Sequence, residues 1–185
     1  MAETMPLETA RLRIVPFSEV HLTPRYVGWL NDPEVVRYSE QRHRAHTIES
    51  CREYWHSFAG TPHHFWAILV SAGPLGHIGT INAYVDEKDL VADVGILIGE
   101  KGAWGQGYGL EAWQAVCRYL LETAGLRKVT AGTMAVNKGM LRIMEKSGMV
   151  DDGRRIRHYL FESREVDVVH GALFSEGRGS EAGLR

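Results

Sequence analysis

Residues 93–112, "DVGILIGEKGAWGQGYGLEA", decide the fold, because an apolar strand-like run leads through a glycine-rich turn into a helical pattern. Four glycines fall within eight positions of the turn, and apolar residues then recur at helical spacing through residues 108–124. Unpaired N–H groups at a helix start and the helix dipole both favour an anion. The junction therefore predicts either an anion site or, as the simpler alternative, a tight turn without a ligand.

Two familiar nucleotide motifs do not fit this turn. A P-loop needs G-x-x-x-x-G-K-[ST], and no Lys-Ser or Lys-Thr pair stands at the required place. A dinucleotide fold needs G-x-G-x-x-G, whereas Gly105, Gly107 and Gly109 are spaced as G-x-G-x-G. Residues 128–133 also lack the acidic residue expected at the end of the next strand.

The periodicity elsewhere predicts a mixed α/β domain rather than a repeating βαβ unit. Three consecutive strands with short connections indicate antiparallel hairpins, and the third is apolar on both faces, as expected of a central strand covered on both sides. The sequence predicts strands at 11–16, 64–70, 77–85, 90–99, 127–134, 154–161 and 166–174, and helices at 18–30, 33–38, 46–59, 108–124 and 137–147.

Size and composition indicate one soluble globular domain over residues 1–174, followed by a flexible Gly-rich tail at 175–185. The chain has 185 residues, 44% of them hydrophobic, and a net charge of −2, so nucleic-acid binding is not expected. No signal peptide or membrane span is recognisable, which predicts a cytoplasmic protein without a membrane partner. Two distant cysteines, Cys51 and Cys117, and scattered histidines predict reduced thiols and no metal site.

Two further segments carry a resemblance when they are set beside the glycine stretch. They are "LETARLRIVPFSEVHLTPRYVGWLNDPEVVRY" (7–38) and "LRKVTAGTMAVNKGMLRIMEKSGMVDDGRRIR" (126–157). Together the three resemble the GNAT superfamily of acetyl-CoA-dependent N-acetyltransferases, in the branch of the Rim-type ribosomal-protein, spermidine and amino-sugar enzymes. The resemblance covers residues 7–174. It implies a mixed, mostly antiparallel sheet of six to seven strands with helices on both faces.

The resemblance also implies where acetyl-CoA binds as cosubstrate. The family motif [QR]-x-x-G-x-[GA], whose main-chain N–H groups hold the pyrophosphate, begins here with a Trp. The preceding strand is expected to splay and pair with the pantetheine arm, and a family asparagine contacts the same arm. In this chain an ordinary helix cap is the alternative for that asparagine. The implied residues are Trp104, Gly105, Gln106, Gly107, Tyr108 and Gly109 in the motif, Ile96, Leu97 and Ile98 in the strand, and Asn137.

Acetyl transfer to an amine requires a base, stabilisation of the oxyanion and a proton for the departing thiolate. Asp93 matches a strand position where relatives commonly carry Glu, and an isolated carboxylate in an apolar strand suggests a functional role. Glu100 is the second candidate. The alternatives are a structural Asp at the strand start and a solvated loop Glu.

The proton donor is where the chain departs from its relatives. They often carry a Ser or a Tyr at the positions of Met140 and Met144, and neither methionine can donate a proton. Solvent or the released ammonium is then the proton source, with three unranked tyrosines as alternatives: Tyr84, Tyr108 and Tyr159. The missing donors also keep open a non-catalytic acetyl-CoA sensor or interaction module on the same fold.

The resemblance leaves the acceptor undefined, as either a small-molecule amine or a protein N-terminal amine, and it allows a homodimer. In this superfamily the N-terminal helices and the loops after them choose the acceptor. Here that region contains a basic cluster at residues 37–46, which suits an anionic or phosphate-bearing acceptor better than a polyamine. A solvated basic loop is the alternative. The candidate acceptor residues are Trp29, Arg37, Tyr38 and Arg42, with core packing as the default for the aromatic ones.

Overall fold

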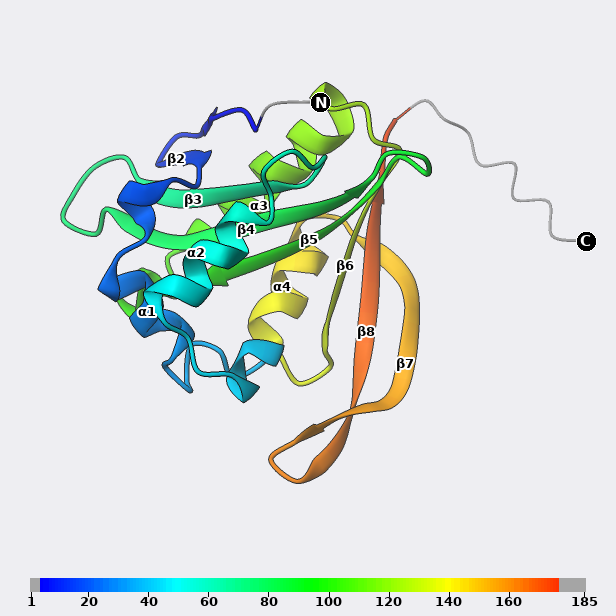
Figure 1. Cartoon of the computed structure of the whole chain (residues 1–185). Helices are drawn as coiled ribbons and strands as arrows, with labels where there is room; N and C mark the ends of the chain where they lie inside the picture. Colours follow the sequence, from blue (N-terminus) through cyan, green and yellow to red (C-terminus); the bar gives the residue numbers. More distant parts are fainter. Residues whose placement is uncertain (1–3, 177–185) are drawn as a thin grey trace, which may run out of the picture.

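The computed structural model describes residues 4–176, which form one eight-stranded sheet in the order β1-β2-β3-β4-β5-β6-β8-β7 (Figure 1). All neighbouring strands are antiparallel except β5 and β6. The resemblance implied six to seven strands, and the extra one is the two-residue β1. The strands are β1 Leu7–Glu8, β2 Leu12–Pro16, β3 His64–Val70, β4 His77–Asp86, β5 Val91–Ile98, β6 Lys128–Met134, β7 Val150–Phe161 and β8 Arg164–Phe174.

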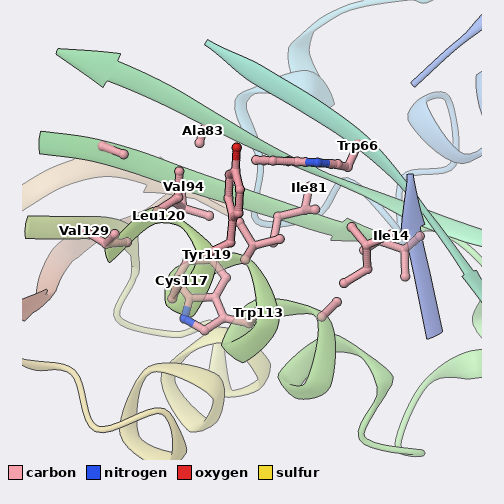
Figure 2. Close-up of a cluster of buried hydrophobic side chains, with 14 of the residues drawn as sticks. Ile14, Trp66, Ile81, Ala83, Val94, Trp113, Cys117, Tyr119, Leu120 and Val129 are labelled. Atoms are coloured by element: carbon pink, nitrogen blue, oxygen red, sulfur yellow. The ribbon is translucent and has the colours of Figure 1, made fainter. Parts of the chain in front are cut away.

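Helices cover both faces of the sheet, so the expected α/β arrangement is confirmed (Figure 1). The larger core lies between the sheet and α3 with the helical turn that follows it, where Trp113 and Leu120 belong to one buried cluster with strand residues such as Ile81 (Figure 2). A second, aromatic-rich core lies between the opposite face and α1 and α2. The helices are α1 Pro24–Leu30, α2 Ile48–His56, α3 Tyr108–Arg118 and α4 Lys138–Lys146.

The N-terminal helices differ from the expectation. The single helix expected at 18–30 is two pieces, because Thr23 is extended and caps α1 at Tyr26, with Pro24 in the first turn. The helix expected at 33–38 is wrong: this segment forms turns, and the Asp32 carboxylate accepts a hydrogen bond from the Glu34 N–H. A short 3₁₀ helix, Glu40–His43, follows instead.

Strands β5 and β6 part in the middle of the sheet. β4 pairs with the whole of β5, through Gly79–Asp86 of β4 and Val91–Ile98 of β5. β6 pairs with β5 only at one end, through Lys128–Thr130 of β6 and Val91–Asp93 of β5. Beyond Thr130, β6 continues beside β8. The two central strands therefore diverge after Asp93 and Thr130, as Figure 1 shows.

The two ends of the chain bear on the predicted domain boundaries. Of the tail expected at 175–185, all but the first two residues lie outside the described part of the chain. Within residues 4–176, no helix has the length and apolar character that crossing a membrane requires.

Candidate functional site

A cleft of about 1210 Å³ opens where β5 and β6 diverge. Its walls come from the diverging strands, the glycine turn, the start of α3 and the inner side of α4. Nine of the ten residues predicted to hold the cofactor line it: Ile96, Leu97, Ile98, Trp104, Gly105, Gly107, Tyr108, Gly109 and Asn137.

The glycine turn has the open backbone that the sequence suggests. Gly105 and Gly107 have φ angles of +74° and +82°, which side-chain-bearing residues rarely adopt, and Gly107 caps α3. A Cβ at Gly105 would meet no atom within 4 Å, so its surroundings are open. Gly109 has a different role, because a Cβ there would lie 3.4 Å from Ile98 and Ile143. It lets α3 pack closely between β5 and α4.

Arg11, the residue immediately before β2, holds this turn, and this role was not predicted from the sequence. Its guanidinium donates to Glu111 in the first turn of α3 at 2.7 Å and to the Gln106 carbonyl at 3.0 Å. It also lies 4.6 Å from the centre of the Tyr108 ring. The Arg11 side chain therefore fixes the turn to the start of α3 from the side away from the cleft.

Trp104, Ile98 and Asn137, all predicted cofactor residues, have polar atoms engaged within the protein. The Trp104 indole N–H donates to the Ile98 carbonyl at 2.8 Å, across the turn. Asn137 caps α4 by accepting from the Met140 N–H at 3.2 Å, and its amide donates to Thr133 at 3.0 Å. Its helix-cap role is thus present in the structure, and the same side chain also lines the cleft.

Asp93 stands at the inner end of the cleft, where the strands part. Its Oδ2 accepts a hydrogen bond from Thr130 Oγ1 at 3.0 Å, and Tyr84 is opposite it on β4. Asp93 is exposed in the open cleft, but the surrounding protein partly desolvates its carboxyl group and raises its pKa above the usual value, although Thr130 and His170 partly offset the effect. Asp93 is therefore a carboxylate of raised basicity facing the cleft.

His170, on β8, is a second titratable residue here that the sequence did not suggest. It is opposite Gly132 of β6, where a Cβ would come within 2.9 Å of its ring atoms Nδ1 and Cε1. The ring thus occupies the space that Gly132 leaves, close enough for its charge to act on Asp93. Its Nε2 is buried without a hydrogen-bond partner among the described residues.

Glu100 has a different environment from Asp93. It forms an ion pair with Arg25 of α1 and accepts a hydrogen bond from the Gly102 N–H at 3.1 Å. Arg25 and this backbone bond lower the pKa of its carboxyl group. Glu100 does not line the cleft. Its contacts are those of a residue that fixes the loop before the glycine turn.

The four candidate acceptor residues separate into two pairs. Arg37 and Tyr38 line the cleft mouth, where Arg37 pairs with Glu162 at 2.6 Å and Tyr38 stacks on Phe161. Trp29 is buried in the α1–α2 core, with its ring against Gly99. Arg42 pairs with Glu40 at 2.8 Å and lies outside the cleft lining.

The candidate proton donors and thiols also have defined positions. Met140, Tyr84, Tyr108 and Tyr159 line the cleft, while Met144 is buried. Burial raises the pKa of Cys117 to about 12 and also raises that of Cys51. Such thiols are poor nucleophiles.

Comparison with known proteins assigns the class. The family model for an acetyltransferase (GNAT) domain matches residues 11–150, and the chain therefore belongs to the GNAT acetyltransferases. An acetyltransferase of this family from Bacillus anthracis has a TM-score of 0.77 at 20% identity, covering 92% of this chain and 98% of that one.

Two further solved structures share the fold and were determined with coenzyme A. RimL, a ribosomal L7/L12 α-N-protein acetyltransferase, has a TM-score of 0.80 at 13% identity, covering 92% of this chain and 98% of its own. Spermidine N-acetyltransferase from Vibrio cholerae, in complex with CoA and spermine, has a TM-score of 0.79 at 14% identity, covering 90% and 97%. The Rim-type resemblance of the sequence is thus matched by similarity in three dimensions.

Proposed function

We propose that this acyltransferase moves the acetyl group of acetyl-CoA directly to a primary amine in the cleft between β5 and β6. The observation that carries the proposal is the parting of these strands after Asp93 and Thr130, which opens a cleft that the glycine turn before α3 also lines. One cleft therefore contains both the turn that we propose as the phosphate site and the Asp93 carboxylate.

The residues of the cleft fit acetyl-CoA along its length. The N–H groups at the start of the eleven-residue α3 and the open backbone of Gly105 and Gly107 suit a pyrophosphate. Arg142 and Lys146 of α4 also line the cleft and add positive charge. Between them and Asp93 the walls are largely apolar, with Ile96 and Met140 among them, as a pantetheine arm requires.

The β6-facing side of β5 beyond Asp93 has no strand partner in the described sheet. Its free N–H and C=O groups can pair with an extended ligand as with another strand. The Ile98 carbonyl already accepts from Trp104, so we place this pairing chiefly at Ile96 and Leu97. Asn137, at the start of α4, then contacts the pantetheine arm with the hydrogen-bonding capacity of its amide that Thr133 and Met140 leave free.

In the transfer, the amine nitrogen forms a bond to the acetyl carbon, the thioester C–S bond breaks, and the thiolate gains a proton. We assign Asp93 the role of accepting the ammonium proton before attack, because it is the acidic residue at the parting of the strands. Glu100 is assigned a structural role because it is paired with Arg25 and does not line the cleft.

The acceptor is a small-molecule amine or a protein N-terminal amine within this proposal. Similar structures are named for both kinds of acceptor, spermidine in one case and ribosomal proteins in another. A cytoplasmic location and a homodimer stay predictions of the sequence.

The first test is calorimetric titration of the purified protein with acetyl-CoA. We expect one saturable site per chain, with affinity reduced when Gly107 is replaced by Ala. No binding at millimolar acetyl-CoA would contradict the proposal.

A second candidate is a non-catalytic acetyl-CoA sensor. It is favoured by the positions of Met140 and Met144, where relatives often carry proton donors, since one is apolar in the cleft wall and the other is buried. Release of thiol from acetyl-CoA with a broad panel of amines separates the two functions. A sensor would bind acetyl-CoA and release no thiol with any of the amines.

A further inference from the structure

The cleft continues into a second pocket of about 490 Å³ beneath α2, on the α1–α2 side of the sheet. Its volume is within the range of small-ligand pockets. Tyr54 of α2 and Tyr84 of β4, whose hydroxyl groups are 2.8 Å apart, stand at its boundary with the cleft. The two spaces share six lining residues: Ser39, Asn82, Tyr84, Gly95, Ile96 and Leu97. We call this space the α2 pocket.

The α2 pocket contains basic but no acidic side chains. Arg44 and His46 line it, and none of its lining residues is Asp or Glu. Arg44 takes part in no ion pair with any residue between 4 and 176. Its positive charge is therefore available to a ligand.

The acidic residues of the neighbouring loops already have partners. Glu34 pairs with Lys101 at 2.6 Å, and Glu40 pairs with Arg42 at 2.8 Å. Glu162, at the tip of the β7–β8 hairpin, pairs with Arg37 at 2.6 Å. A ligand with several positive charges would thus find Asp93 as its main acidic contact, whereas a ligand with a negative charge would find Arg44 unpaired.

His46 lines the same wall of the pocket as Arg44. Both polar atoms of the Asn31 carboxamide bind the His46 backbone at 2.8 Å, so the position of this residue is fixed. Its side-chain Nε2 is buried and has no hydrogen-bond partner within the described chain. A ligand group in the pocket would therefore contact the lining part of the His46 side chain and not this buried nitrogen.

We propose that the acceptor is an amine carrying an anionic group, a carboxylate or a phosphate, and that this group binds in the α2 pocket beside Arg44 and His46. The amine then extends past Tyr84 to Asp93. This inference rests on the proposed acetyl transfer for the role of the amine, but binding of the anion can be measured without it. It excludes a polyamine as the preferred acceptor.

The test uses acceptors of one chain length that differ only at the far end. They are 6-aminohexanoate, 6-aminohexyl phosphate, hexylamine and 1,6-diaminohexane, with kcat/KM measured from thiol release at saturating acetyl-CoA. We expect the better of the two anionic acceptors to exceed the diamine by about tenfold or more, the size of one charge-assisted hydrogen bond. The two anionic arms distinguish carboxylate from phosphate.

Two variants with the same change in charge provide the control. Arg44→Gln should remove the preference for the anionic acceptors and leave hexylamine unchanged, while Arg44→Lys should keep part of the preference. Arg118→Gln alters an exposed residue of α3 outside both pockets, and it should behave as wild type. Equal effects of Arg44→Gln and Arg118→Gln, or a diamine used as well as the anionic acceptors, would overturn the inference.

A binding measurement separates this inference from the transfer reaction. The N-acetylated forms of 6-aminohexanoate and hexylamine are titrated into the protein with and without coenzyme A and followed by NMR shifts. We expect tighter binding of the carboxylate form, lost in Arg44→Gln, even if no thiol is released. Equal binding of both forms would overturn the anion site, whereas absence of acetyl-CoA binding would contradict only the proposed function.

Discussion

Asp93 of β5 and Thr130 of β6 form the last pair of the one parallel ladder in the described sheet, and their side chains are joined by a 3.0 Å hydrogen bond. Beyond them the strands diverge and the cleft begins. The same position thus ends the pairing of the strands and supplies the carboxylate assigned as the base.

Replacing Asp93 by Asn should lower kcat/KM by about 10²- to 10⁴-fold near neutral pH, the range for loss of a general base. Because the base acts deprotonated, wild-type activity should rise with pH through the raised pKa of Asp93. The deficit of the variant should shrink at high pH, where the amine loses its proton unaided. A pH series of kcat/KM measures both effects, and a constant ratio of the two enzymes across it would contradict the assignment.

The same substitution should stabilise the fold. Partial desolvation raises the pKa of Asp93 in the native state, so the ionised form is disfavoured by folding, and stability is lost as the pH rises through that pKa. Asn has no charge and can still accept the hydrogen bond from Thr130. Urea unfolding at pH 7 should therefore give Asp93→Asn a higher free energy of unfolding, with the difference vanishing at acidic pH. Lower stability of the variant at pH 7 would contradict this account.

Glu100→Gln should leave kcat nearly unchanged, since Glu100 is paired with Arg25 outside the cleft. The pair is partly exposed, so its loss should reduce the free energy of unfolding by at most about 1 kcal/mol. Arg25 lowers the pKa of Glu100 in the folded state, so the ion pair stabilises the fold above the ordinary pKa of 4.5. This stabilisation is lost as the pH falls through the lowered pKa. A large fall in kcat would reinstate Glu100 as a candidate base.

Gly107→Ala should weaken acetyl-CoA binding by about tenfold or more, because a side-chain-bearing residue at φ +82° displaces the amides that start α3. Gly60→Ala is a matched control. Gly60 has a φ of +73° with open space around it and lies in the loop between α2 and β3. Both variants should lose similar stability, while calorimetry should show reduced affinity only for Gly107→Ala. Equal affinities would contradict a phosphate site at the turn.

Arg11→Ala should raise KM for acetyl-CoA several-fold with little change in kcat, since Arg11 holds the turn through Glu111 and the Gln106 carbonyl and does not line the cleft. Arg13→Ala, in β2 two residues further along the chain, removes only a 4.0 Å contact with Glu8 between exposed side chains. Steady-state kinetics should leave this control unchanged. A matching rise in KM for both variants would show that the turn does not depend on Arg11.

The sequence predicted the elements whose signals are local. Strand β3 and the glycine turn follow from patterns a few residues long. The helix expected at 33–38 failed because the Asp32 side chain satisfies the next backbone groups in a turn instead of opening a helix. The N-terminal strand β1 was missed because two residues carry no recognisable period.

The site was predictable only in part, for the same reason. Asp93 and the glycines lie in one continuous stretch, so the sequence alone showed them together. Arg11 and Glu111 are a hundred residues apart, and their contact depends on the strand order. His170 reaches the cleft only because β8 pairs with β6 opposite Gly132. No local pattern encodes either contact.

The most direct test of the account is to incubate the protein with an amine and acetyl-CoA labelled in its acetyl group, and to identify the product by mass spectrometry. We predict labelled acetamide and free coenzyme A in equal amounts, with both greatly reduced in Asp93→Asn. Binding of acetyl-CoA without labelled acetamide across a broad panel of amines would contradict the central claim.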